Sequence, residues 1–167
     1  MRKLLFVATL VIAGSFALSA CNKQDDSDQQ AQQQVQKVSK PANPQDDAAW
    51  GKYLAQILSS NMQGMTADRP YAYLVPSGDD DASVAKRQRQ LDSVTDTVLR
   101  GVLPGNLLAF GGPDSAKTAD FIVSAFAKAQ PGTFKGVIVL FIGDQADQQR
   151  VADAVKPSGA TFRFVQM

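Results

Sequence analysis

An apolar run of eight residues, GVIVLFIG at 136–143, constrains the fold more than any other part of the sequence. It contains no polar side chain, and its interior consists of Val, Ile, Leu and Phe. Such a run is typical of a strand in a parallel sheet, because helices cover both faces of that strand. We therefore expect residues 136–143 to form a central strand.

Segments with strand-like and helix-like patterns alternate around this run. Strands are predicted at 71–75, 106–110, 136–143 and 161–166, and helices at 81–102, 115–130 and 144–159. This alternation indicates an α/β fold whose parallel strands are joined by right-handed crossovers. We predict a single three-layer α/β/α domain with a four-stranded, mostly parallel sheet. The predicted strand order is 2-1-3-4, with the first strand beside the third.

An amphipathic helix is predicted before the first strand, at residues 46–63. Trp50, Tyr53, Leu54 and Ile57 recur at spacings of three and four residues and form an apolar stripe. We expect this stripe to pack on the domain. Contact with a partner or with the membrane is the alternative.

Residues 1–20 have the layout of a secretory signal peptide. Arg2 and Lys3 precede an apolar run from Leu4 to Leu18, and small residues follow. The run is shorter than the roughly 20 residues that a membrane-spanning helix needs. We therefore expect a cleaved signal and not a transmembrane anchor.

The sequence LSAC at 18–21 resembles the lipobox of bacterial lipoproteins. The resemblance implies cleavage before Cys21, a diacylglycerol group on its sulfur, and an acylated new amino terminus. Cys21 is the only cysteine in the chain, so the exported domain forms no internal disulfide. By the sorting rule of many Gram-negative lipoproteins, Asn22 in place of aspartate implies an outer-membrane lipoprotein that faces the periplasm.

Residues 21–45 are predicted to be a disordered tether that carries the lipidated cysteine. The segment is rich in Gln, Asp and Ser, and it ends with two prolines. It cannot bury enough apolar surface to offset its ordering entropy. As a flexible coil of about 24 residues it spans roughly 25–30 Å. The folded domain is then predicted to comprise residues 46–167.

Composition excludes several classes of function. The 17 basic side chains less Arg2 and Lys3 leave 15 against 16 aspartates, a balance that gives no electrostatic reason for nucleic-acid binding. The chain has no histidine and no glutamate. The absence of histidine removes Ser-His-Asp and Cys-His catalysis and the usual zinc sites.

The stretch AFGGPDSAKTAD at 109–120 partly resembles a nucleotide-binding loop. Pro113 has no N–H to donate, and Asp114 places a carboxylate where phosphates would sit. We predict that the two glycines make a turn, that Asp114 or Ser115 caps the next helix, and that Lys117 faces solvent. Binding of a nucleotide or another cofactor is not expected.

Three acidic groups follow predicted strands: Asp79–Asp81, Asp114 and Asp144. Ligands of open α/β sheets bind where the strand order reverses, which the predicted order places between Asp79 and Asp144. Carboxylate oxygens suit magnesium or calcium, and paired aspartates support metal-assisted hydrolysis. Helix capping is the alternative role for these side chains.

Lys86, Arg87 and Arg89 form a short basic patch in AKRQRQ at 85–90. It is expected to be the solvated face of a helix, with a contact to anionic lipid or a partner as the alternative.

The function that we expect is non-catalytic. We expect the chain to be a membrane-anchored envelope lipoprotein that binds a protein partner or a small ligand in the periplasm. The alternative is a metal-dependent hydrolase that uses Asp79, Asp114 and Asp144.

Lipidation is tested by growing cells with radiolabelled palmitate. The chain is expected to take up the label through Cys21 and to lose its first 20 residues. A chain that keeps these residues, or that stays unlabelled, contradicts the lipoprotein assignment.

Overall fold

The structure is a computed structural model, and it describes residues 39–167. The predicted signal peptide, Cys21 and most of the predicted tether lie outside these residues. The elements are α1 (Asp47–Ser59), β1 (Tyr71–Leu74), α2 (Asp81–Arg100), β2 (Leu107–Gly111), α3 (Ser115–Phe126), β3 (Ile138–Gly143), α4 (Gln145–Val155), the 3-10 turn η1 (Lys156–Ser158) and β4 (Thr161–Gln166). The predicted α/β class and the four-stranded parallel sheet are confirmed.

The strand order is β1-β2-β3-β4, so the predicted order 2-1-3-4 is wrong. β2 pairs with β1 on one side and with β3 on the other, and all its residues are buried. The segment at 106–110 is nearly as apolar as 136–143, and a strand buried on both faces belongs inside a sheet. β3 is internal as predicted, whereas β1 is an edge strand.

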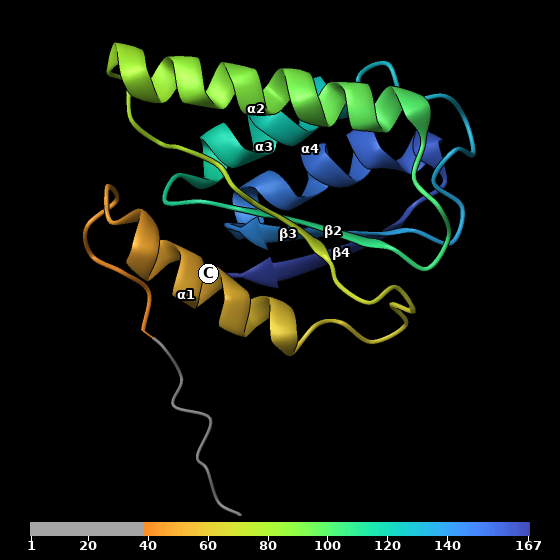
Figure 1. Cartoon of the computed structure of the whole chain (residues 1–167), viewed down its shortest axis with the longest axis horizontal. Coiled ribbons are helices and arrows are strands. Elements are labelled where there is room, and N and C mark those ends of the chain that lie inside the picture. Colours follow the sequence, from red (N-terminus) through yellow and green to blue (C-terminus); the bar gives the residue numbers. More distant parts are fainter. Residues whose placement is uncertain (1–38) are drawn as a thin grey trace, which may run out of the picture. The chain divides into compact units, whose positions relative to one another are not determined.

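The strand order also determines where the connecting helices lie. Right-handed crossovers that always step in the same direction place all their helices on one face of the sheet. Figure 1 shows α2, α3 and α4 together on one face and α1 on the other. The predicted three-layer arrangement placed crossover helices on both faces. In the structure the crossover helices cover one face, and α1 alone covers the other.

Each face of the sheet has its own apolar core. Leu108, Phe110, Val139 and Phe141 face α2, α3 and α4. Alternate residues of the same two strands face α1, and these are Leu107, Ala109, Ile138, Leu140 and Ile142. This alternation follows from the two-residue period of a strand. The internal strands β2 and β3 therefore connect the two cores.

α1 covers its face of the sheet with the predicted apolar stripe. Trp50, Tyr53, Leu54 and Leu58 are buried, and Asp46 caps the helix by accepting a hydrogen bond from the Ala49 N–H. Each large apolar side chain that is fully buried contributes about 1.5–3 kcal/mol. Packing of this helix on the domain is thus confirmed. Within residues 39–167, no helix is long and apolar enough to cross a membrane.

Candidate functional site

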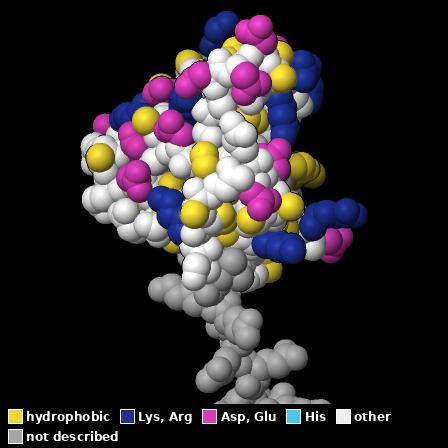
Figure 2. Space-filling model, turned by 90° about the vertical axis from the view of Figure 1, so that its left-hand side faces the viewer, with side chains coloured by type: hydrophobic (Ala, Val, Ile, Leu, Met, Phe, Trp, Pro, Cys, Tyr) yellow, Lys and Arg dark blue, Asp and Glu magenta, His cyan; other side chains and the backbone are white. Residues whose placement is uncertain are grey.

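The carboxyl ends of the four parallel strands lie at one end of the domain, together with the first turns of the helices. In Figure 1 this carboxyl end is on the left. Figure 2 views it directly and shows aspartates mixed with basic and apolar side chains. The acidic residues singled out in the sequence all lie there, because each follows a strand and begins a helix.

Two cations hold the β1–α2 loop, where Asp79 lies. The Arg87 guanidinium donates to the carbonyls of Pro76 (2.8 Å) and Gly78 (3.0 Å). Lys117 Nζ donates to the Ser77 carbonyl (2.5 Å) and to Asp79 Oδ1 (2.6 Å). Three successive loop carbonyls therefore accept hydrogen bonds from cationic side chains.

These contacts change the interpretation of two basic segments. Lys117 was expected to face solvent, but its side chain is only 26% exposed and fixes a loop 40 residues earlier in the chain. Arg87 is likewise bound to backbone, and Lys86 Nζ lies 2.6 Å from Asp47 Oδ2 on α1. Lys86 and Arg89 are exposed, as expected for a solvated face, whereas Arg87 is partly buried and bound to the loop.

Asp114 caps α3, as predicted. Its Oδ1 accepts the Lys117 N–H at 2.9 Å. The preceding Gly112 lies against β1, since a Cβ built there would be 2.4 Å from the Val75 carbonyl oxygen and 3.0 Å from Thr118 Oγ1. The glycine is needed for close approach of two backbone segments, and no phosphate has to be invoked for it.

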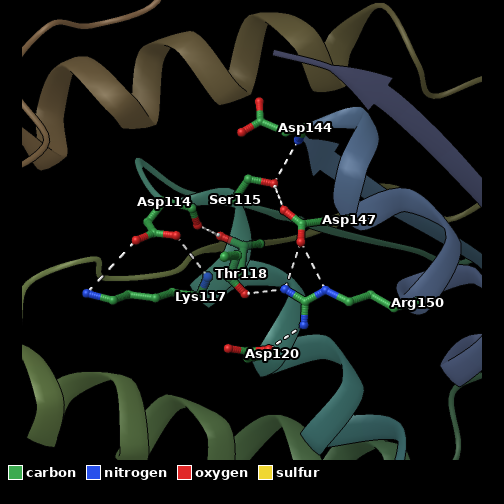
Figure 3. Close-up of polar contacts among 9 residues, drawn as sticks. Asp114, Ser115, Lys117, Thr118, Asp120, Asp144, Asp147 and Arg150 are labelled. Atoms are coloured by element: carbon green, nitrogen blue, oxygen red, sulfur yellow. Dashed lines mark hydrogen bonds and ion pairs between the residues drawn. The ribbon is translucent and has the colours of Figure 1, made fainter.

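Asp144 precedes α4, but its carboxylate accepts no capping hydrogen bond. Its backbone N–H instead donates to Ser115 Oγ at 2.7 Å. The same hydroxyl donates to Asp147 Oδ2 at 2.6 Å. Figure 3 shows the Asp144 carboxylate directed away from this contact. Ser115, which is 5% exposed, thus connects the start of α3 to the β3–α4 turn.

Arg150 completes this network between α3 and α4 (Figure 3). Its Nε and Nη2 donate to Asp147 Oδ1 at 3.0 and 2.8 Å. Nη2 also donates to the Ala116 carbonyl at 2.9 Å, and Nη1 pairs with Asp120. One guanidinium therefore binds the first two turns of α3 to the first turns of α4.

The charges at this end stabilise the ionised carboxylates. The hydrogen bond from Lys117, and then its positive charge, lower the pKa of Asp79. Partial burial raises the pKa of Asp147, but the hydrogen bonds from Ser115 and Arg150 outweigh it, so the net shift is downward. A carboxylate with a lowered pKa is a weak proton acceptor. The Ser115–Asp147 contact is therefore poorly suited to activating a nucleophile.

The three aspartates proposed as metal ligands do not share one site. Asp79 is bound to Lys117, Asp114 caps α3, and Asp144 points elsewhere. Among residues 39–167, no three acidic side chains come together in a way that could hold a metal ion. Metal-dependent hydrolysis remains a prediction from the sequence to which this geometry adds no support.

An apolar hollow of about 190 Å³ lies elsewhere, between α1 and the edge strand β1. Its lining consists of Gly51, Leu54, Ala55, Leu58, Ala72, Tyr73, Leu74, Ala109, Phe110, Gly111 and Ile142. A Cβ built on Gly51 would meet no other atom within 4 Å. Small side chains on both elements thus leave room for one apolar group.

Sequence reasoning missed both the Ser115–Asp147–Arg150 network and the hollow. Asp147 and Arg150 are three residues apart on a helix, a spacing that predicts their ion pair. Nothing in the sequence pairs Ser115 with a residue 32 positions later. The hollow depends on which strand is at the edge, and the predicted strand order placed β1 inside the sheet.

The close approach at Gly112 predicts that Gly112→Ala lowers the free energy of unfolding by about 1–3 kcal/mol, because the new methyl group overlaps a backbone carbonyl. Urea unfolding measures this. Gly51→Ala is the matched control, since the space there is open, and it is expected to leave stability unchanged or raised. Equal effects of the two substitutions would contradict the proposed contact.

The lowered pKa of Asp147 predicts acid sensitivity. The pKa of Asp147 is lower in the folded state than in the unfolded state, so the ionised carboxylate contributes its full stabilisation of the fold at neutral pH. This stabilisation is lost as the pH falls below about 4 and passes the folded-state pKa, because the carboxylate becomes protonated. Asp147→Asn is expected to cost about 1–3 kcal/mol at pH 7 and progressively less in acid. Unfolding measured across pH tests this, with the exposed Asp153→Asn as control. A cost that is constant down to pH 2 would contradict it.

Neither the scan against protein-family models nor the searches of curated proteins and solved structures finds a match for this chain. The geometry of residues 39–167 is therefore the basis for a functional proposal.

Proposed function

We propose that the chain is a lipid-anchored envelope protein whose domain binds a partner protein without catalysing a reaction. The lipobox-like sequence at Cys21 supports the anchor, and Asn22 supports an outer-membrane position facing the periplasm. The apolar hollow between α1 and β1 is the observation that carries the binding role. The polar network at the carboxyl end is assigned a structural role.

The size of the hollow favours one side chain of a partner over a whole small molecule. Pockets for drug-sized ligands measure about 300–1,000 Å³, whereas this hollow measures about 190 Å³. A cavity of roughly 150 Å³ in another protein holds benzene. One aromatic or branched aliphatic side chain therefore fits the available space.

The edge of β1 offers backbone groups beside the hollow. The Val75 N–H donates to the Gly111 carbonyl at 2.8 Å, so alternate residues direct their backbone groups towards β2. Ala72 and Leu74 then direct theirs outward, and the Leu74 carbonyl indeed accepts from Gln90 Nε2 on α2. An extended partner segment can pair with Ala72 while one of its side chains enters the hollow.

Photo-crosslinking in cells tests this proposal. A photoreactive residue at Ala55, which is exposed and lines the hollow, is expected to capture an envelope protein. Gly51→Leu is expected to reduce the adduct at least tenfold, because the leucine side chain fills the hollow.

Gly51→Ala is the matched control for Gly51→Leu. Both replacements remove a helical glycine, which raises stability by about 0.5–1 kcal/mol, so loss of the adduct cannot be attributed to unfolding. The alanine variant is expected to retain the adduct. Capture that is equal in all three proteins, or that is absent at Ala55, would refute the proposed binding site.

A further inference from the structure

The amino ends of the strands lie at the opposite end of the domain, on the right in Figure 1. Three loops meet there through backbone hydrogen bonds, and the α1–β1 loop borders them, because the Thr66 and Ala67 N–H groups donate to the Gly105 carbonyl. The Gly105 N–H donates to the Gly136 carbonyl at 2.7 Å, and the Phe134 N–H donates to the Ser158 carbonyl at 2.9 Å. The loops after α2, α3 and α4 therefore form one continuous surface, which we call the amino-end surface.

Four exposed cations lie on the amino-end surface: Arg100, Lys128, Lys135 and Lys156. None of them forms an ion pair within the described part of the chain. Arg100 and Lys156 lie at helix C-termini, where the helix dipole favours a cation. Lys128 directly follows the C-cap of α3, whereas Lys135 lies further along the α3–β3 loop, so the dipole does not explain Lys135. Asp96 and Asp153 lie four and two residues before the last residues of α2 and α4. In the bordering α1–β1 loop, the charges of exposed Asp68 and Arg69 offset each other.

Two leucines are exposed on the same surface. Leu103 is 78% exposed, the highest value among the large apolar side chains in residues 39–167, and Leu99 is 45% exposed. Leu103 lies in the α2–β2 loop, three residues after Arg100. Leu103 protrudes at the same end of the domain as these cations, and such an exposed side chain has no packing role inside the domain.

We infer that the amino-end surface binds the surface of an anionic phospholipid bilayer. Membrane-surface binding combines buried apolar area with attraction of basic side chains to anionic headgroups. The cations and Leu103 supply these two components on one side of the molecule. The acidic carboxyl end lies opposite, so the charge distribution orients the domain with its amino end towards the lipid.

A bilayer fits this surface better than an acidic protein. Recognition of a carboxylate commonly uses bidentate arginines, whereas three of the four cations here are lysines, which act as point charges. Leu103 stands on a loop, where it can enter a headgroup layer. The proposed tether also permits the contact, because its span of roughly 25–30 Å matches the length of α2, about 30 Å for 20 residues.

Lysine protection on vesicles tests the inference. The full chain, purified from the cell envelope, is mixed with vesicles of phosphatidylcholine alone or with added phosphatidylglycerol. An amine-acylating reagent then modifies lysines, and mass spectrometry measures the rate at each one. Lys128, Lys135 and Lys156 are expected to react several-fold more slowly on the anionic vesicles, while exposed Lys52 on α1 does not change. High salt should abolish the difference by screening.

The comparison of neutral with anionic vesicles does not depend on the lipid anchor, since an anchor at Cys21 inserts into both. Leu103→Asp is expected to remove most of the protection, and Val84→Asp is the matched control. Val84 is an aliphatic residue of similar type, 44% exposed, near the start of α2 at the carboxyl end. Equal loss in both variants would refute a role for Leu103.

Two further results would overturn the inference. Equal lysine rates on neutral and anionic vesicles would refute bilayer binding. Protection by soluble polyaspartate, with none by anionic vesicles, would assign the surface to an acidic protein.

Discussion

The burial of β2 and β3 on both faces is the constraint on which the rest of this structure depends. Two adjacent apolar strands must be covered from each side, and the connecting helices cover one side only. The other side needs an additional element, which α1 supplies with Trp50, Tyr53, Leu54 and Leu58. The N-terminal helix is therefore an integral part of the folded domain.

Much of the fold could be predicted from local patterns. The strand at 161–166 was predicted with the observed bounds, and the other elements differ by a few residues at their ends. Strand order could not be predicted in the same way, because it is set by pairing between segments far apart in the chain, which local patterns do not show. The apolar residues at 106–110 indicated a buried strand, but the predicted order has this strand at an edge. That order also contains a reversal, where a ligand site was expected. The observed order has no reversal.

The candidate site shows a second limit of sequence reasoning. A helix cap at Asp114 or Ser115 was predicted from local residues alone, since a cap binds an N–H three residues away, and Asp114 is the cap in the structure. Lys117 and Arg87 were interpreted as solvated, because their acceptors are backbone carbonyls in a loop. A carbonyl has no residue-specific signature, so no motif in the sequence could reveal these contacts.

The way in which α1 is joined to the preceding chain has a mechanical consequence. Trp50 Nε1 donates to the Asn43 carbonyl at 3.0 Å, and the N-terminal end of α1 is the part of the domain nearest the preceding chain. If the proposed membrane anchor is correct, a pull along the chain would first load this tryptophan contact and then peel α1 from its N-terminal turn. The ion pair between Lys86 on α2 and Asp47 in the first turn of α1 would be loaded next, so tension at this end would reach the crossover helices through α2 as well as α1.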